Sequence, residues 1–233
     1  EEIVRAAQRY QSQSIAYTYT EPTIFFEYTY DIAQLAHQIG IASVYVTNGY
    51  MTREMLALFQ GLSDGHEPWL DAANVDLKAF RDETYRQVCK ARLQPVLDSL
   101  KAMKELGVWV EVTTLVVPGM NDSEEELRDI ATFIARELGV ETPWHVSRFH
   151  PDYQMLDRGP TPPETLRRAY ELGCEAGLRY VYIGNLPSAR LEDTRCPNCH
   201  KTVIGRWGFQ VTLRHIQNGR CAFCGTVIDG IGM

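Results

Sequence analysis

The chain has 233 residues, a hydrophobic fraction of 45% and a formal net charge of −7. This length suits one large domain with or without a small appendage, and the apolar fraction is enough to fill a core. The acidic balance, without any Lys- or Arg-rich block, argues against nucleic-acid binding. No apolar run reaches the roughly 18 residues of a membrane span, and no signal peptide is visible. We therefore expect a soluble, cytoplasmic protein with no nucleic acid or membrane as partner.

Strand-like runs alternate with amphipathic stretches along most of the chain. The runs expected to form strands are residues 14–20, 42–48, 74–80, 108–117, 143–150 and 179–185. The stretches expected to form helices are residues 24–39, 52–60, 84–106, 124–138 and 162–176. This alternation predicts a parallel sheet, either open and doubly wound or closed into a complete or partial barrel. No G-x-G-x-x-G motif follows the first strand, which weakens the dinucleotide-binding version.

Two of the helix starts carry a capping signature. Ser123 with Glu126 and Thr161 with Glu164 both fit a capping box, in which a hydroxyl caps the helix and a carboxylate returns the contact. Pro162 then falls at the first helical position, where its missing N–H does no harm.

Polar residues gather where the predicted strands end. The main candidates are Glu21, Thr47, Asn48, Asp76, Lys78 and His150. In parallel α/β folds the carboxyl ends of the strands share one edge, and ligands bind there. Read singly, Glu21 fits a turn before Pro22, Asp76 and Lys78 fit an ion pair, and His150 fits a packed histidine. Together they favour a site, because buried charges are costly unless they are paired or used.

Four of the six cysteines form two pairs near the C-terminal end. Cys196 and Cys199 make one C-x-x-C pair, and Cys221 and Cys224 make the other after a short strand-rich stretch. Two such pairs supply four thiolates to one tetrahedral metal, which predicts a zinc-ribbon-like module at residues 191–233 after a main domain at residues 1–190. Rubredoxin-like iron or an auxiliary cluster are the alternatives to zinc.

The order of the strand-end motifs resembles a known family. The motifs are Thr20-Glu21-Pro22, Thr47-Asn48-Gly49, Asp76-Leu77-Lys78, Val116-Val117-Pro118-Gly119 and Phe149-His150. They are similar to those of radical S-adenosylmethionine (radical SAM) enzymes of the glycyl-radical-activating type, related to pyruvate formate-lyase activating enzymes. The phrases AYTYTEPTIFFEY, DAANVDLKAF, EVTTLVVPGMNDS, PWHVSRFHPDY and RYVYIGNLP, with the Cys-rich tail, look more specifically like the radical SAM enzyme of the AmmeMemoRadiSam system.

The resemblance implies a fold, cofactors and partners. The fold is a partial (β/α)6 barrel, and the cofactors are S-adenosylmethionine and a [4Fe–4S] cluster. The chemistry is reductive cleavage of S-adenosylmethionine and hydrogen abstraction from a substrate. The resemblance does not identify this substrate and includes proteins among the candidates. An electron donor such as flavodoxin or ferredoxin and an AmmeMemoRadiSam-system protein are the implied partners.

The same resemblance assigns cofactor-binding roles to residues. Thr20 and Glu21 stand where the family has a G-G-E-P motif, with Glu21 expected to hold the methionyl ammonium. Thr47 and Asn48 are expected near the cofactor. The remaining candidates are Asp76, Lys78 and His150, which match further family positions.

Three departures from the family pattern stand out. Tyr19 and Thr20 replace the two glycines, so close backbone approach to the cofactor is less assured. Thr113 occupies a position where activating enzymes often carry arginine. The C-x-x-x-C-x-x-C loop that ligates the cluster is missing, and Cys89 and Cys174 have the wrong spacing to replace it. Because residues 1–10 already show helical spacing, we expect that loop to lie upstream, with this chain being a fragment.

Two other functional classes remain as alternatives. One is a non-radical barrel enzyme with Lys78 as a Schiff-base amine, although the neighbouring Asp76 would keep that amine protonated. The other is a scaffold that recruits a partner through the zinc module.

Overall fold

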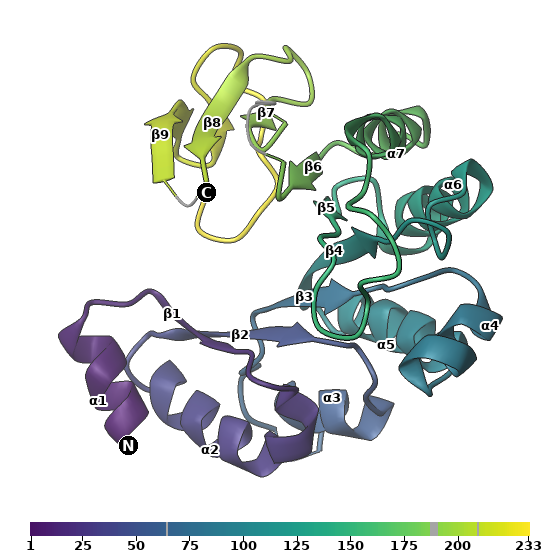
Figure 1. The fold of residues 1–233 in the computed structure, drawn as a ribbon. Helices are drawn as coiled ribbons and strands as arrows, with labels where there is room; N and C mark the ends of the chain where they lie inside the picture. The colour runs from purple at the N-terminus through teal and green to yellow at the C-terminus, as the bar shows by residue number, and fades with distance from the viewer. Residues whose placement is uncertain (64, 187–190, 209) are drawn as a thin grey trace. The chain divides into compact units, whose positions relative to one another are not determined.

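In the computed structural model, the six predicted strands form one sheet in chain order. The structure describes residues 1–63, 65–186, 191–208 and 210–233. The sheet order is β1-β2-β3-β4-β5-β6, and the registers of β1 with β2, β2 with β3, β4 with β5 and β5 with β6 are all parallel (Figure 1). The α/β fold class expected from the alternating pattern is therefore confirmed.

The chain divides into two compact units, of which the first holds residues 1–77 and 90–111. Its elements are α1 (Glu2–Arg9), β1 (Ser14–Tyr17), the 3₁₀ turn η1 (Pro22–Phe25), α2 (Phe26–His37), β2 (Ala42–Thr47), α3 (Arg53–Phe59), β3 (Ala72–Asp76) and α5 (Leu93–Glu105). Tyr45 of β2 is fully buried and packs edge-on against Phe59 of α3, with ring centroids 5.4 Å apart. Its hydroxyl bonds the hydroxyl of Thr29 on α2, so both helices cover this face of the sheet.

The second unit holds residues 78–89 and 112–233. Its main elements are α4 (Asp82–Thr84), the π-helical turn η2 (Tyr85–Cys89), α6 (Glu124–Phe133), a second π-helical turn η3 (Ile134–Leu138), β5 (Trp144–Arg148), α7 (Pro163–Glu175) and β6 (Val181–Gly184), while β4 (Trp109–Val116) begins in the first unit. Gly173 of α7 lies so close to β5 and β6 that a Cβ there would sit 2.7 Å from Val181 and 3.1 Å from Trp144. This glycine lets the helix pack directly on the strands.

The opposite face of β4, β5 and β6 carries partly exposed side chains. Thr113, His145 and Tyr182 are register partners across the three strands. The His145 and Tyr182 rings stack with centroids 5.0 Å apart.

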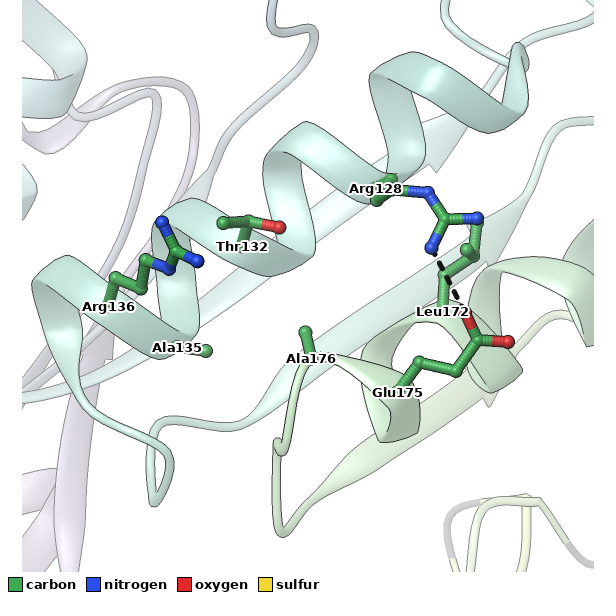
Figure 2. A pocket seen from close by; sticks show the side chains of 7 residues that line it. All are labelled: Arg128, Thr132, Ala135, Arg136, Leu172, Glu175 and Ala176. Atoms are coloured by element: carbon green, nitrogen blue, oxygen red, sulfur yellow. Dashed lines mark hydrogen bonds and ion pairs between the residues drawn. The ribbon is translucent and has the colours of Figure 1, made fainter.

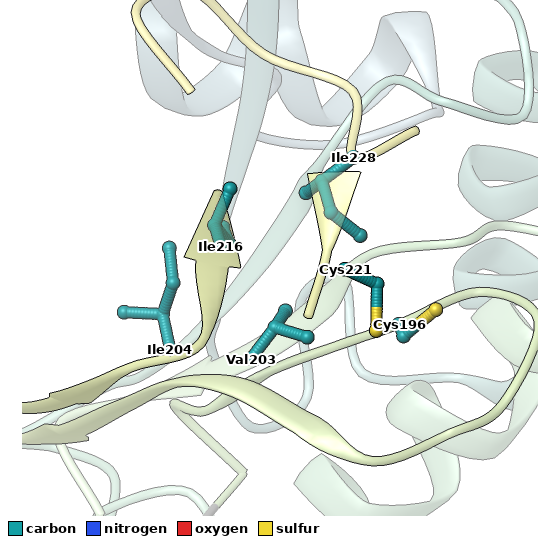
Figure 3. Close-up of a cluster of buried hydrophobic side chains, with 6 residues drawn as sticks. All are labelled: Cys196, Val203, Ile204, Ile216, Cys221 and Ile228. Carbon is teal, nitrogen blue, oxygen red and sulfur yellow. The ribbon is translucent and has the colours of Figure 1, made fainter. Parts of the chain in front are cut away.

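Residues 191–233, which carry the paired cysteines, contain a set of short strands, and we call this stretch the module. Its strands are β7 (Thr194–Arg195), β8 (Thr202–Trp207), β9 (Gln210–Arg214), β10 (Ile216–Gln217) and β11 (Arg220–Cys221). They build a three-stranded sheet, β7-β8-β9, and a two-stranded ribbon, β10-β11. A buried cluster of Val203, Ile204, Ile216 and Ile228 packs against two of the cysteines (Figure 3). The predicted boundary between residues 190 and 191 stays a prediction, because residues 187–190 lie outside the described residues. These include Pro187, the last residue of the motif RYVYIGNLP.

One predicted helix is broken. The stretch 84–106 was expected to be continuous, but η2 ends at Cys89, Lys90 adopts a left-handed φ of 55°, and a new helix begins at Leu93. Pro95 is the physical reason, because proline lacks an N–H and is tolerated only in the first turn of a helix.

One predicted capping box is confirmed only in its hydroxyl cap, and the other is wrong. Ser123 accepts a hydrogen bond from the Glu126 amide at 3.2 Å, as a cap should. Thr161 does not cap α7: its hydroxyl donates to the Val116 carbonyl at 2.6 Å and accepts from the Phe149 amide at 2.8 Å. The helix begins at Pro163, one residue later than expected, with Pro162 as its N-cap.

Within the part of the chain that the structure describes, no helix combines the length and apolar character needed to cross a bilayer.

Candidate functional site

Glu21 lies at the carboxyl end of β1 and its carboxylate is held by four donors. Oε1 accepts from the Thr47 hydroxyl at 2.6 Å, from the Thr23 hydroxyl at 3.0 Å and from the Thr23 amide at 3.3 Å. Oε2 accepts from the Asn48 amide at 2.7 Å. The carboxylate therefore joins the end of β1 to the end of β2, and its orientation is fixed before any ligand arrives.

The Glu21 carboxylate keeps room for one more donor. A carboxylate offers about four lone-pair positions, two on each oxygen. Oε2 has one protein donor, the Asn48 amide. In the described residues no lysine or arginine forms an ion pair with Glu21, and the side chain is only partly buried. A negative charge that is oriented but has no cationic partner suits a ligand carrying an ammonium group.

The turn after β2 is shaped by Thr47 and Gly49. The buried Thr47 hydroxyl donates to Glu21 and accepts from the Gly49 amide at 3.0 Å. Gly49 has a φ of +71°, and a Cβ there would lie 2.6 Å from Val75 and 3.2 Å from Val96. The tight turn thus requires glycine twice over, for its conformation and for its packing.

Two further candidates of the first unit lie at the same edge of its strands. Asp76 is the last residue of β3. The residue before it, Val75, is the register partner of Thr47 on β2. Thr20 is exposed and precedes Glu21 directly. The structure therefore brings Glu21, Thr47 and Asn48 into contact and places Asp76 at the end of the adjoining strand.

Lys78 and His150 belong to the second unit. The backbone amide of Lys78 donates a hydrogen bond to the Tyr85 hydroxyl at 3.1 Å. His150 is exposed, with Nδ1 3.0 Å from the Pro151 carbonyl oxygen. Their expected cofactor contacts stay predictions.

Asn121 is a residue whose importance the sequence analysis did not anticipate. It is 2% exposed, and its side-chain amide donates to the carbonyls of Lys78 at 2.6 Å and Leu115 at 2.8 Å. Its oxygen accepts from the Val117 amide at 2.7 Å. The Pro-Gly-Met-Asn-Asp loop is therefore a brace for two strand ends. The only sequence signal was an asparagine in a turn-rich loop, which is too common to single it out.

The four paired cysteines come together as predicted. The Sγ atoms of Cys196 and Cys224 are 3.6 Å apart, those of Cys199 and Cys221 are 3.7 Å apart, and all four lie within 4.8 Å of one another. A tetrahedral zinc with Zn–S bonds of about 2.3 Å would place its sulfurs about 3.8 Å apart. The donor set and its spacing therefore fit a tetrahedral thiolate-bound metal.

The backbone around the cysteines supports the same conclusion. Each pair is followed by a residue in the left-handed region, His200 with φ 57° and Gly225 with φ 74°. The His200 amide donates to the Cys196 carbonyl, and the Gly225 amide donates to the Cys221 carbonyl, at 2.9 and 2.8 Å. Hydrogen bonding to the Thr226 hydroxyl and amide lowers the pKa of the Cys224 thiol to about 6. The Lys201 amide opposes, without cancelling, the burial and the neighbouring sulfurs that raise the pKa of the Cys199 thiol to about 11. The protein alone thus favours one thiolate, and a bound metal would hold the others in that form. His200 occupies the left-handed position of this turn, and the four cysteines supply a complete tetrahedral ligand set without it.

A shallow pocket between α6, η3 and α7 is a weaker candidate site. Figure 2 shows it lined by Arg128, Thr132, Ala135, Arg136, Leu172, Glu175 and Ala176. Arg128 is already neutralised by Glu124 and Glu175, at 2.8 and 3.0 Å. These exposed ion pairs account for the charge of Arg128 as ordinary surface contacts between helices.

Comparison with known proteins gives a consistent result. A family model described as the radical SAM superfamily matches residues 1–134, more than half of the chain. An uncharacterized protein of Methanocaldococcus jannaschii is 46% identical over 231 residues, which cover 98% of this chain and 66% of that protein. The pyruvate formate-lyase-activating enzyme of Clostridium pasteurianum is 27% identical over 143 residues, 56% of each chain. The chain thus spans about two thirds or less of the length of these curated relatives.

A solved structure shares the fold. SuiB of Streptococcus suis, bound to S-adenosylmethionine, aligns with a TM-score of 0.63 and 13% sequence identity over 82% of this chain and 42% of that one. At this identity the likeness concerns the fold, and it agrees with the partial barrel that the family resemblance implies.

Proposed function

This chain belongs to the radical SAM superfamily, a superfamily of enzymes, and we propose that it forms the S-adenosylmethionine-binding part of such an enzyme. The observation that carries the proposal is the Glu21 carboxylate. It is pre-oriented by Thr23, Thr47 and Asn48, retains acceptor capacity and has no cationic partner in the described chain. An amino-acid ammonium group would complete its coordination.

The residues present would then divide the work of holding the cofactor. Glu21 would accept from the ammonium, while Thr47 and the Asn48 amide keep its two oxygens in place. Asp76, Lys78 and His150 are proposed further contacts, supported by their match to the family motifs. The cofactor supplies one-electron chemistry and hydrogen abstraction in this superfamily, and the protein supplies its binding and orientation.

A [4Fe–4S] cluster of the kind that works with S-adenosylmethionine does not fit the cysteines of this sequence. Four of the six belong to the Cys196–Cys224 group, which is the only cluster of three or more potential metal ligands among the described residues. Cys89 and Cys174 belong to no group of three or more potential metal ligands among the described residues. We propose that the cluster ligands lie outside these 233 residues, so that this chain alone binds S-adenosylmethionine without cleaving it.

The nature of the substrate is a finer proposal. The relative from Clostridium pasteurianum is named for activating pyruvate formate-lyase, an enzyme and therefore a protein. We propose a protein substrate for this chain too, within the AmmeMemoRadiSam group whose motifs it resembles. Flavodoxin or ferredoxin would be the electron donor of the complete enzyme. For the Cys196–Cys224 group we propose structural zinc.

Binding of S-adenosylmethionine to the purified chain tests the proposal directly. Glu21→Gln keeps the size and the acceptor oxygen of the side chain but removes its charge. Hydrogen bonds between charged groups contribute about 1.5–3 kcal/mol, so binding measured by calorimetry should weaken about 10- to 100-fold. Glu27→Gln, the same change at an exposed position of α2, should leave binding unchanged.

A second ligand separates a lost contact from a damaged fold. Methylthioadenosine lacks the amino-acid group, so its binding should be equal in the wild type and in Glu21→Gln. If S-adenosylmethionine bound both proteins equally, Glu21 would not hold the ammonium. Anaerobic reconstitution with iron and sulfide should yield no 5′-deoxyadenosine, and its formation would refute the proposal that the cluster ligands lie elsewhere.

A further inference from the structure

Strand β9 forms an unpaired edge of the small C-terminal sheet. The sheet order is β7-β8-β9, so β9 has β8 on one side and, among the described residues, no strand on the other (Figure 1). All five of its residues, Gln210–Arg214, are exposed. An open strand edge presents free N–H and C=O groups that can pair with another chain.

One hydrogen bond shows in which direction these free groups point. The His215 amide donates to the Val203 carbonyl at 2.7 Å, toward β8. Because N–H groups alternate sides along an antiparallel strand, the Arg214 amide points to the open edge. Register shifts occur between β8 and β9, but β9 itself contains neither proline nor lysine, the residues that most often protect an edge.

Apolar side chains accompany this edge. Val211 is 62% exposed and Leu213 is 37% exposed. The register pairs Leu213 with Gly205 and Val211 with the next residue, Arg206, so the two apolar side chains lie on opposite faces of the sheet. Trp207, at the end of β8, is 69% exposed. A segment laid along β9 would therefore find backbone partners together with one exposed apolar side chain of β9 on each face of the sheet.

The module carries the opposite charge to the rest of the chain. Residues 191–233 contain five Lys or Arg and three Asp or Glu, a formal charge of +2. Residues 1–190 contain 18 basic and 27 acidic residues, a formal charge of −9. The module that carries the open strand therefore has a net positive charge, and Arg214 lies on the strand itself.

The basic side chains of the module have no carboxylate partner within the described chain. They contact carbonyl oxygens, a hydroxyl or an aromatic ring instead, and they are Arg195, Lys201, Arg206, Arg214 and Arg220. Meanwhile Asp229 of the module is taken by Tyr180 and Arg179. The positive charge is therefore available to an acidic partner.

We propose that β9 binds an extended acidic polypeptide, which adds to the small sheet as a strand next to β9. Main-chain hydrogen bonds would supply the part of the affinity that does not depend on sequence. The positive charge and the exposed side chains of Val211 and Leu213 would select the sequence. Pairing of β9 with β9 of a second copy is disfavoured, because it would bring two positive modules together. The proposal rests on the module alone and does not depend on S-adenosylmethionine binding.

The test uses the whole metal-loaded chain and labelled peptides of about ten residues, followed by fluorescence anisotropy. One peptide alternates Glu with Val, a second alternates Lys with Val, and a third is the first with alternate amides N-methylated. The acidic peptide should bind, the basic one should bind at least about tenfold more weakly, and the N-methylated one should lose binding because it cannot pair with the edge.

Two variants separate charge from edge pairing. Arg214→Ala removes one charge and should weaken the acidic peptide by about two- to tenfold. Arg214→Pro removes the same charge and the outward N–H, so it should bind at least about tenfold more weakly than Arg214→Ala. Arg136→Ala, at an exposed arginine of η3, is the matched control and should bind as the wild type does. Metal content and urea unfolding check that each variant is folded.

Four results would overturn the proposal. The acidic peptide could fail to bind, or could bind no better than the basic one. The N-methylated peptide could bind as well as its parent, which decides the matter even if Arg214→Pro does not fold. A single-stranded RNA of about ten nucleotides could bind more tightly than the acidic peptide, making the surface a nucleic-acid site. Finally, the chain could be a dimer that Arg214→Pro dissociates, making β9 a self-association strand.

Discussion

At the scale of single residues, the candidate site depends on side chains that act on the backbone as much as on a ligand. Glu21 caps η1 through the Thr23 amide and also reaches the Asn48 amide of the next strand end. A purely structural role would explain these bonds but not the unused acceptor position or the lack of a cation. The site is consequently one in which stability and binding share the same carboxylate.

Gly49 provides a residue-scale prediction about this site. Gly49→Ala should destabilise the protein by about 1–3 kcal/mol, because the added Cβ meets Val75 and the left-handed φ disfavours alanine. Gly40→Ala is the control: its φ is +73°, yet nothing lies within 4 Å of the added Cβ. Urea unfolding should show the larger loss for Gly49. Equal losses would mean that packing against Val75 relaxes at no cost.

Much of the site could be read from residue types, and the rest could not for a physical reason. Glu21, Thr47 and Asn48 were recognisable because they follow predicted strands and belong to motifs that occur in the same order as in the family. Their mutual hydrogen bonds followed from the parallel register. Asn121 was not recognisable, since its value comes from being buried between two carbonyls, and burial of a loop residue leaves no periodic pattern. Thr161 was assigned to a cap because its spacing to Glu164 fitted, although strand contacts compete for the same hydroxyl.

At the scale of elements, the strands were predictable and one helix was not. Each strand is an apolar run bounded by turn residues, so its existence followed from composition alone. The stretch 84–106 keeps a helical period across the break at Lys90, because apolar spacing on either side stays in phase. The predicted capping box of α6 also differs in the structure. The Glu126 carboxylate accepts a hydrogen bond from the Phe80 amide instead of the Ser123 amide.

Glu126 gives a pH-dependent prediction. The residue is 3% exposed, and burial raises the pKa of its carboxyl while the Phe80 amide partly opposes this. A raised pKa means that the folded protein binds this proton more tightly than the unfolded chain. The corresponding stability is present below the unfolded pKa and is lost as pH rises through the folded pKa.

Glu126→Gln isolates that contribution. Glutamine keeps an acceptor for the Phe80 amide but cannot ionise. The difference in unfolding free energy between the variant and the wild type should therefore shift in favour of the variant between about pH 4 and about pH 7. Glu125→Gln, at the exposed neighbouring position, should show no comparable shift. A constant difference across this range would contradict the assigned burial effect.

At the scale of the whole molecule, the metal group is the feature with the largest expected effect on folding. The module of residues 191–233 has only a small apolar cluster, and structural zinc can contribute about 10–16 kcal/mol to the folding of such a unit. Removal of the metal by a chelator should expose the amides of residues 196–229 to hydrogen exchange while the strands β1 to β6 stay protected.

A pair of cysteine variants provides the control. Cys199→Ser should lower metal content and reproduce the loss of protection, because it removes one of the four thiolates. Cys174→Ser, at an exposed thiol of α7, should change neither. Unchanged protection of residues 196–229 after complete metal removal would show that the module folds through its apolar cluster alone.

The contacts between β6 and the module have a mechanical consequence. The Tyr182 hydroxyl lies 3.0 Å from the Thr194 hydroxyl at the start of the module, and the Tyr180 hydroxyl donates to Asp229 near its end at 2.9 Å. Tyr180 and Tyr182 stand two residues apart and so project from one side of the chain. The module is therefore hydrogen-bonded to residues 180–182 both near its first residues and near its last. A force applied to β9 would therefore reach residues 180–182 through two separate contacts, and the His145 ring through its stacking on Tyr182.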